Sequence, residues 1–221
     1  TRDITGWSAD QIRALTTDQV VSLTQSQVSN LSNYQLTGFT SAQIVAIETA
    51  DLVSMGTGQF ASLQSDQLRA LTSTQIQAIE TRDINALTQD QMSSLKESQI
   101  TALSTLQISN IGSQQLTGMT TAQLQAIATD DMAVLQTSNI RALGDSISVF
   151  TSLQIPHLQS QQIRILSSDK VSSMLSDQLR SLTTEQLGYF QSLQISGLQP
   201  DQLNVFKTEQ IRSEEHTSEL Q

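Results

Sequence analysis

The sequence is poor in the residue types on which most protein chemistry depends. Its 221 residues include no cysteine and two histidines, His157 and His216. The lack of cysteine excludes disulfide scaffolds, thiolate nucleophiles and thiolate-bound iron–sulfur clusters. Two histidines leave any zinc site dependent on carboxylates. We therefore expect no metal or other cofactor, and no enzymatic activity.

Charged residues are also scarce, at 14% of the chain, and their signs are unbalanced. Eleven Lys and Arg stand against 21 Asp and Glu, which gives a formal net charge of −10. A surface of this sign repels phosphate backbones, so we expect no nucleic-acid partner. No apolar run approaches the roughly 18 residues of a membrane-spanning helix, which predicts a chain without a membrane span.

What the chain has in abundance is an eight-residue repeat, Leu-Thr/Ser-x-x-Gln-Ile/Leu-x-Ala/Ser. We call it the octad and count it from its Thr/Ser to its next Leu, as in 16–23. The Ile/Leu position recurs every eight residues from Ile4 to Ile140 and, after one missing residue near Gly144, from Ile147 to Ile211. All 27 of these positions hold Ile, Leu, Val, Met or Phe. We expect a single octad-repeat solenoid over residues 1–211, with an irregularity at 143–158.

A period of eight excludes one long helix. Eight residues overshoot two helical turns by about 80°, so an apolar stripe would circle the helix, and coiled coils need periods of seven or eleven. In a strand, the two apolar positions of an octad would face opposite sides. Gln, Ala, Leu, Asp and Ser are also poor strand formers. A β-solenoid therefore stays only as the alternative.

The spacing within an octad is that of a helix start. Thr16 and Gln19 form a capping box, in which each side chain bonds the other residue's backbone N–H. Leu15 and Val20 then occupy the two positions of a hydrophobic staple. We expect an all-α solenoid of very short capped helices, one per octad. Residue sizes at the Leu position alternate over sixteen residues, which favours two helices per layer, and small residues before Leu would let helices approach closely.

Four apolar residues occur where other octads are polar, directly before the Gln. They are Tyr34, Leu106, Leu153 and Leu193. If exposed, they would form the candidate interaction surface, with a protein or a glycan as partner. A contiguous apolar groove that contains them would favour binding, whereas a uniformly polar surface would favour a spacer.

The last ten residues, 212–221, depart from the octad. They resemble the translation of a sequencing-library adapter at all ten positions, so we expect a non-native, disordered or frayed tail. A gene taken from an assembled metagenomic read would account for it. The chain also has no initiator Met. We therefore expect an internal slice, flanked by further repeats or domains.

The octad pattern over residues 4–211 resembles Gln/Thr/Ala-rich octapeptide arrays of large bacterial surface or secreted proteins of the adhesin-like kind. The resemblance implies a bacterial protein at the cell surface or outside the cell. Our leading hypothesis is a structural repeat module, a spacer, stalk or scaffold without catalysis. The alternative is a protein- or glycan-binding solenoid that acts in adhesion through one exposed face.

Overall fold

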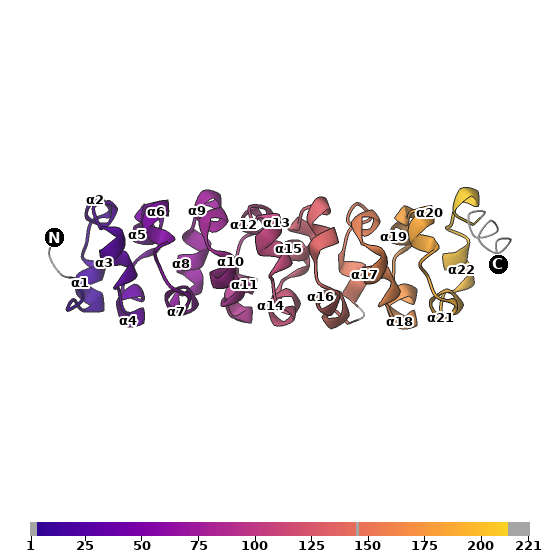
Figure 1. Cartoon of the computed structure of the whole chain (residues 1–221), viewed down its shortest axis with the longest axis horizontal. Helices are drawn as coiled ribbons and strands as arrows, with labels where there is room; N and C mark the ends of the chain where they lie inside the picture. Colours follow the sequence, from indigo (N-terminus) through magenta and orange to yellow (C-terminus); the bar gives the residue numbers. More distant parts are fainter. Residues whose placement is uncertain (1–3, 145, 212–221) are drawn as a thin grey trace. The chain divides into compact units, whose positions relative to one another are not determined.

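The structure, a computed structural model, describes residues 4–144 and 146–211. Each octad from 8–15 to 199–206 contributes one helix of three to six residues. The described residues contain no strand. The expected all-α solenoid with one short helix per octad is confirmed, and the β-solenoid alternative is wrong (Figure 1). The predicted tail at 212–221 lies outside the described residues.

The helices follow one another along the chain with two or more non-helical residues between most of them. In chain order they are α1 (Ala9–Arg13), α2 (Thr17–Val21), α3 (Gln25–Ser29), α4 (Asn33–Leu36), α5 (Ser41–Ala46), α6 (Thr49–Leu52), α7 (Thr57–Ser62), α8 (Ser65–Ala70), α9 (Ser73–Ala78), α10 (Thr81–Asn85), α11 (Gln89–Ser94), α12 (Glu97–Thr101), α13 (Thr105–Ser109), α14 (Ser113–Gly118), α15 (Thr121–Ala126), the 3-10 helix η1 (Thr129–Val134), α16 (Thr137–Ala142), the 3-10 helices η2 (Ser146–Val149) and η3 (Ile155–His157), α17 (Ser160–Arg164), α18 (Ser168–Ser172), α19 (Ser176–Ser181), α20 (Thr184–Leu187), α21 (Ser192–Ser196) and α22 (Pro200–Leu203).

The capping box predicted from the sequence is present. Thr16 Oγ1 accepts from the backbone N–H of Gln19 at 3.2 Å, and Gln19 Oε1 accepts from the N–H of Thr16 at 2.9 Å. The two halves of the box are not equally general. Gln59 reaches back to the N–H of Gly56 at 2.8 Å, although glycine offers no oxygen in return. The Gln is therefore the more constant half of the box.

The two apolar positions of each octad form the core. In octad 40–47, Ile44 is fully buried and Ile47 is 2% exposed. Burial of such a side chain contributes about 1.5–3 kcal/mol. A helix of six residues is far below the roughly 12 residues that an isolated helix needs. Packing between octads must therefore supply the stability that single octads lack.

The chain divides into two compact units, Thr1–Gln123 and Leu124–Gln221. Within the first unit α1 packs against α4, α2 against α5 and α11 against α14. Within the second, η1 packs against η3 and α18 against α21. In every one of these pairs the partner lies three octads further along. Figure 1 shows α4 and α7 of the first unit along the same edge.

This interval corrects the expected two helices per layer. Side-chain size at the Leu position alternates between octads that are neighbours in the sequence, whereas the contacts between helices join octads that are three apart. Each short helix with its extended link carries the chain through less than half a turn of the solenoid. The chain therefore returns to the same side only at the third following octad. The close approach predicted for the small residue before Leu is confirmed at Gly38, which follows α4: a Cβ there would lie 2.4 Å from the carbonyl oxygen of Ala9 in α1.

The irregular stretch has its own local structure. After α16, Gly144 adopts a φ of 57°, a left-handed conformation that favours glycine. The 3-10 helices η2 and η3 follow, with Pro156 in the first turn of η3. The structure thus absorbs the missing residue within two octads. No helix in the described parts of the chain has the length and apolar character required to cross a bilayer.

Candidate functional site

The Gln of the capping box makes a second set of contacts that the capping pattern does not predict. Gln43 Nε2 donates to the main-chain carbonyl oxygens of Ile12 at 3.1 Å, Arg13 at 3.1 Å and Leu15 at 2.7 Å. Gln43 Oε1 meanwhile accepts from the N–H of Thr40 at 2.7 Å. One buried amide therefore caps its own helix and joins that helix to the octad that lies four octads earlier in the chain.

This double contact recurs through both units, and we call the set of such side chains the glutamine ladder. Its members are Gln35, Gln43, Gln59, Gln67, Gln75, Gln91, Gln99, Gln107, Gln115 and Gln123 in the first unit and Gln154, Gln162, Gln178, Gln186, Gln194, Gln202 and Gln210 in the second.

The ladder continues across the irregular stretch within the second unit. Gln186 bonds Leu158, 28 residues earlier, at 2.9 Å. Gln162 bonds Leu135, 27 residues earlier, at 2.7 Å. The difference of one residue is the residue lost near Gly144. The same partners still meet, so the loss leaves the pairing of octads unchanged.

A signal for the ladder was available in the sequence. A capping box accepts Glu as readily as Gln, yet none of the 27 octads has Glu at this position. Glu supplies the oxygen that caps the helix but not the N–H groups that reach the carbonyls of another octad. This difference explains why Gln is used at this position and Glu is not, although Asp replaces the Gln in octads 48–55 and 80–87.

Lys170 shows what else these carbonyl groups accept. It occupies the Gln position of octad 167–174 and is 6% exposed. Its Nζ donates to the carbonyl oxygens of Ile140 at 3.0 Å and Arg141 at 2.9 Å. The carbonyl groups four octads earlier thus accept an ammonium group as well as an amide.

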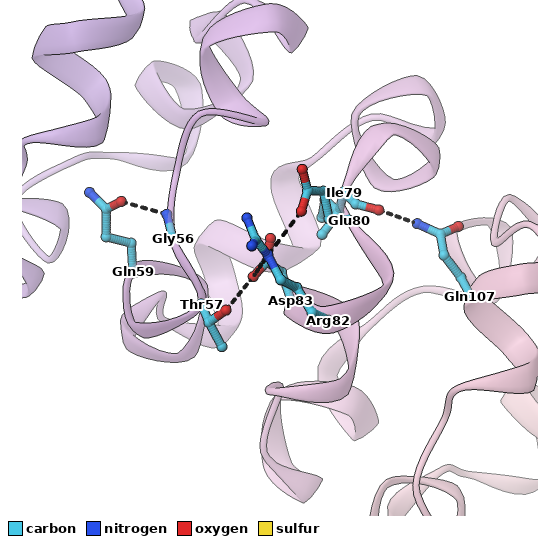
Figure 2. Close-up of polar contacts among 8 residues, drawn as sticks. All are labelled: Gly56, Thr57, Gln59, Ile79, Glu80, Arg82, Asp83 and Gln107. Atoms are coloured by element: carbon cyan, nitrogen blue, oxygen red, sulfur yellow. Dashed lines mark hydrogen bonds and ion pairs between the residues drawn. The ribbon is translucent and has the colours of Figure 1, made fainter.

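Asp83 is the opposite case, because an ionised carboxylate has no hydrogen to donate. It occupies the Gln position of octad 80–87 and is 1% exposed. Thr57 Oγ1 donates to Asp83 Oδ1 at 2.6 Å, whereas the buried Oδ2 has no hydrogen-bond partner among the described residues. Arg82 Nε lies 3.7 Å from Asp83 Oδ1 and 2.9 Å from Glu80 Oε2 (Figure 2). This acidic octad is a local break in the ladder.

Asp51 breaks the ladder in the same way in octad 48–55. Burial raises the pKa of its carboxyl above the ordinary value, and the nearby Glu48 raises it further. The N-cap residue of this octad, Glu48, makes no side-chain cap either. In the described residues, no three His, Asp or Glu side chains gather in a way that would hold a metal ion. The acidic octads therefore give no direct indication of a metal centre.

The four predicted surface residues are all exposed, at 69% for Tyr34, 64% for Leu106, 73% for Leu153 and 71% for Leu193. Within a unit they lie far apart in octads, since Tyr34 is in α4 and Leu106 in α13. Leu106 borders a hollow of about 450 Å³, together with Ile79, Glu80 and Arg82. The structure does not bring the four residues into one groove inside either unit.

A second, more apolar hollow lies at α20–α22, and no feature of the sequence predicts it. It measures about 280 Å³ and is lined mainly by Phe190, Ile195, Leu198, Leu203 and Phe206. All five stand at the Ile or Leu position of an octad. Residues at these positions are buried in the middle of the array, so the sequence alone does not indicate that these five line a hollow.

Tyr189, which precedes Phe190 in the chain, makes two polar contacts. The Arg164 guanidinium lies 5.3 Å from the ring centre of Tyr189. The Tyr189 hydroxyl donates to Glu185, and this hydrogen bond raises the pKa of the phenol.

Comparison with known proteins supports the repeat and leaves the activity open. The family model of the ALTTAQ repeat matches residues 44–81 and, in overlap, residues 60–97. The two matches start sixteen residues apart, which is two octads. A search of curated proteins gave no match. The chain is a repeat protein that is similar to ALTTAQ repeats over these residues.

Proposed function

We propose that this chain is a non-catalytic structural module, a spacer or scaffold within a larger extracellular bacterial protein. The glutamine ladder is the observation that carries the proposal. Each ladder amide bonds the N–H of its own N-cap residue and carbonyl groups four octads earlier. Neighbouring turns of the chain are therefore joined by buried hydrogen bonds. Such a connection resists extension, because pulling two turns apart would leave buried carbonyl groups unsatisfied.

The use of the polar side chains supports the absence of catalysis. The Ser and Thr hydroxyls at the N-cap accept from the backbone, as Thr88 does from Gln91 at 3.2 Å. His157 is exposed and lies 3.5 Å from the exposed carboxylate of Asp130. Neither arrangement pairs a nucleophile with a buried base, which nucleophilic catalysis requires.

Stiffness within one unit is the test of the spacer role. Since the chain has no cysteine, Thr17→Cys with Ser73→Cys gives two exposed labelling sites in the first unit. Spin-label distance measurements should give one narrow distribution, and it should broaden when Gln43→Ala and Gln59→Ala are added. The Gln19→Ala variant is the matched control, because Gln19 makes only the capping contact. A broad distribution in the parent double-cysteine chain would contradict the proposal.

The extracellular location rests on the resemblance to arrays of large bacterial surface proteins. The full-length gene should encode an export signal, and proteolysis of intact cells should cleave the array. Protection of the array in intact cells, with cleavage only after lysis, would refute this part of the proposal.

A second candidate function is binding of a protein or a glycan in adhesion through one exposed face. The hollow beside Leu106 favours it, because an exposed leucine there meets Ile79 and the paired charges of Glu80 and Arg82. Screening of the chain on glycan and bacterial-surface protein arrays should then give a ligand whose binding Leu106→Ser weakens. Leu153→Ser, which removes an equally exposed leucine, should leave that binding unchanged.

A further inference from the structure

Two buried oxygen atoms that accept hydrogen bonds have no donor at the acidic octad 80–87. The first is Asp83 Oδ2, which belongs to a side chain that is 1% exposed. The second is the main-chain carbonyl oxygen of Met55, a buried residue, to which no group in the described parts of the chain donates a hydrogen bond. A buried acceptor without a donor is unfavourable. Two of them at one place indicate a donating or positively charged group between them.

The ladder rule places these two oxygens opposite each other. In the next octad, Gln91 bonds the carbonyl oxygen of Leu63, which lies 28 residues earlier. Met55 likewise lies 28 residues before Asp83. The hydrogen bond from Thr57 Oγ1 to Asp83 Oδ1, at 2.6 Å, holds the carboxylate against the segment that contains Met55 (Figure 2).

The carboxylate does not reach as far as a ladder amide. An Asp side chain has one carbon fewer than Gln, which shortens it by about 1.5 Å. The amide of Gln91 lies 2.7 Å from its carbonyl oxygen. By this comparison, Asp83 Oδ2 lies on the order of 4 Å from the carbonyl oxygen of Met55. That separation is too long for a direct hydrogen bond, even with a proton on the carboxyl group. A bridging atom or molecule is needed to join the two oxygens.

The charges around the gap favour a cation as the bridge. Arg82 lies between two carboxylates, 3.7 Å from that of Asp83 and 2.9 Å from that of Glu80, so one negative charge stays uncompensated. Helices α7 and α13, which pack against α10, contain no charged residue. The other acidic octad adds two further carboxylates, Glu48 and Asp51. A water molecule would leave the negative charge in place, whereas a monovalent cation would cancel it.

Lys170 shows how a monovalent cation lies on the carbonyl groups of the ladder. Its Nζ is 3.0 Å from the carbonyl oxygen of Ile140 and 2.9 Å from that of Arg141. In that octad the chain itself supplies the ammonium group. Octad 80–87 instead supplies a carboxylate, so the cation has to come from solution.

We propose that octad 80–87 binds a monovalent cation of the size of an ammonium ion, namely K⁺, between Asp83 Oδ2 and the carbonyl oxygen of Met55. Main-chain carbonyl oxygens replace the hydration shell of K⁺ in potassium channels. The bound ion joins octad 80–87 to octad 48–55, as a ladder amide joins other octads. The site is independent of the spacer role, which a chain without bound K⁺ would still fulfil.

Urea denaturation of the 221-residue chain in KCl and in choline chloride tests the proposal. Equal ionic strength keeps the screening of the acidic surface constant. The equilibrium constant for unfolding should be lower in KCl, by about twofold when the K⁺ concentration equals Kd and by about tenfold at ten times that concentration. LiCl and CaCl₂ should have smaller effects, because Li⁺ is too small to reach both oxygens and Ca²⁺ requires about six to eight oxygen ligands.

Two variants of Asp83 remove the site in different ways. Asp83→Asn keeps the shape of the side chain and removes its charge. Asp83→Lys places an ammonium group on the carbonyl groups, as Lys170 does. Circular dichroism checks that each variant is folded, and both should lose the difference between KCl and choline chloride. Asp90→Asn, at an exposed position in the next octad, is the matched control and should keep that difference.

Crystals of the chain grown with RbCl locate the ion directly. Rb⁺ substitutes for K⁺ and should give an anomalous difference peak between Asp83 and Met55, which should be absent in Asp83→Asn. Four outcomes would overturn the proposal: equal stability in KCl and choline chloride, a K⁺ effect that persists in both Asp83 variants, a larger effect of Ca²⁺ than of K⁺, or no peak at this place.

Discussion

Octads 72–79 and 80–87 are adjacent in the chain and have the same helical course, but they are joined to the array in different ways. In the first, Gln75 caps Thr72 and donates to Ile47 four octads earlier at 2.9 Å. In the second, Asp83 Oδ1 accepts a hydrogen bond from the Thr57 hydroxyl, and the buried Asp83 Oδ2 has no hydrogen-bond partner among the described residues. Both octads keep their place through the apolar positions, and the residue at the Gln position changes which hydrogen bonds join the octad to its neighbours.

The largest effect should come from turning the Gln octad into a charged one. Gln75→Glu keeps the capping oxygen but sets a buried carboxylate against the carbonyl groups of Val45 and Ile47. We expect a loss of about 3 kcal/mol or more in the free energy of unfolding, measured by urea denaturation. The control is Gln77→Glu, an exposed position in the same octad, which should change stability by less than about 0.5 kcal/mol. Equal effects at the two positions would contradict the ladder.

The second largest effect on stability compares a ladder Gln, which makes both the capping bond and the bonds to another octad, with a Gln that makes only the capping bond. Gln43→Ala removes the cap and the bonds to Ile12, Arg13 and Leu15, and should cost about 2–3 kcal/mol. Gln19→Ala removes only a cap and should cost about 1 kcal/mol. Hydrogen exchange at the amides of the affected octads gives both values locally. If the two substitutions cost the same, the cross-octad bonds contribute nothing.

Repair of the acidic octad should raise stability. Asp83→Gln supplies the amide that octad 80–87 lacks, towards the carbonyl groups of Leu52 and Met55, and removes a buried oxygen without a partner. We expect a gain of about 1–2 kcal/mol in the urea transition. Asp90→Gln, at an exposed position in the next octad, is the matched control and should give no gain. A destabilised Asp83→Gln would show that the bond from Thr57 outweighs the ladder contact.

The smallest effect concerns pH at the other acidic octad. The pKa of Asp51 is higher in the folded state than in the unfolded chain, so folding favours its protonated form. This site therefore stabilises the fold most below the ordinary pKa of 3.8 and loses that contribution as pH rises through the folded pKa. Asp51→Asn should flatten the acidic part of the stability profile between pH 3 and 7. An unchanged slope would contradict the raised pKa.

Much of the fold could be predicted from local spacing. Thr16 and Gln19 lie within one octad, three residues apart. This local spacing is sufficient to predict the capping box and a short helix. The partner of Gln43 lies 28 to 31 residues earlier, and identical octads give no indication of which two meet. For that reason the octad pattern predicts two helices per layer and gives no sign of the ladder.

The sequence predicts the exposed residues of the candidate interaction surface one by one, but not how they lie relative to one another. Tyr34 and Leu106 break the polar pattern and are exposed, but the sequence does not show whether exposed residues of different octads share a side. The hollow at α20–α22 has no local signature, because Phe190 and Leu203 are ordinary core residues whose exposure depends on which octads cover them. The buried, unpaired oxygen of Asp83 also depends on a neighbour, Thr57, that is 26 residues away.

The glutamine ladder has a consequence for how such a gene can change in length. Because every octad presents the same carbonyl groups, duplication or loss of a whole octad shifts each partner by one and replaces it with a chemical equivalent. Slippage during replication would therefore alter the reach of the protein without a compensating mutation elsewhere. The residue lost near Gly144 shows that even an imperfect deletion is confined to its own two octads. Length, in such an array, is a trait that can change by whole octads while the octads inside the array keep partners of the same kind.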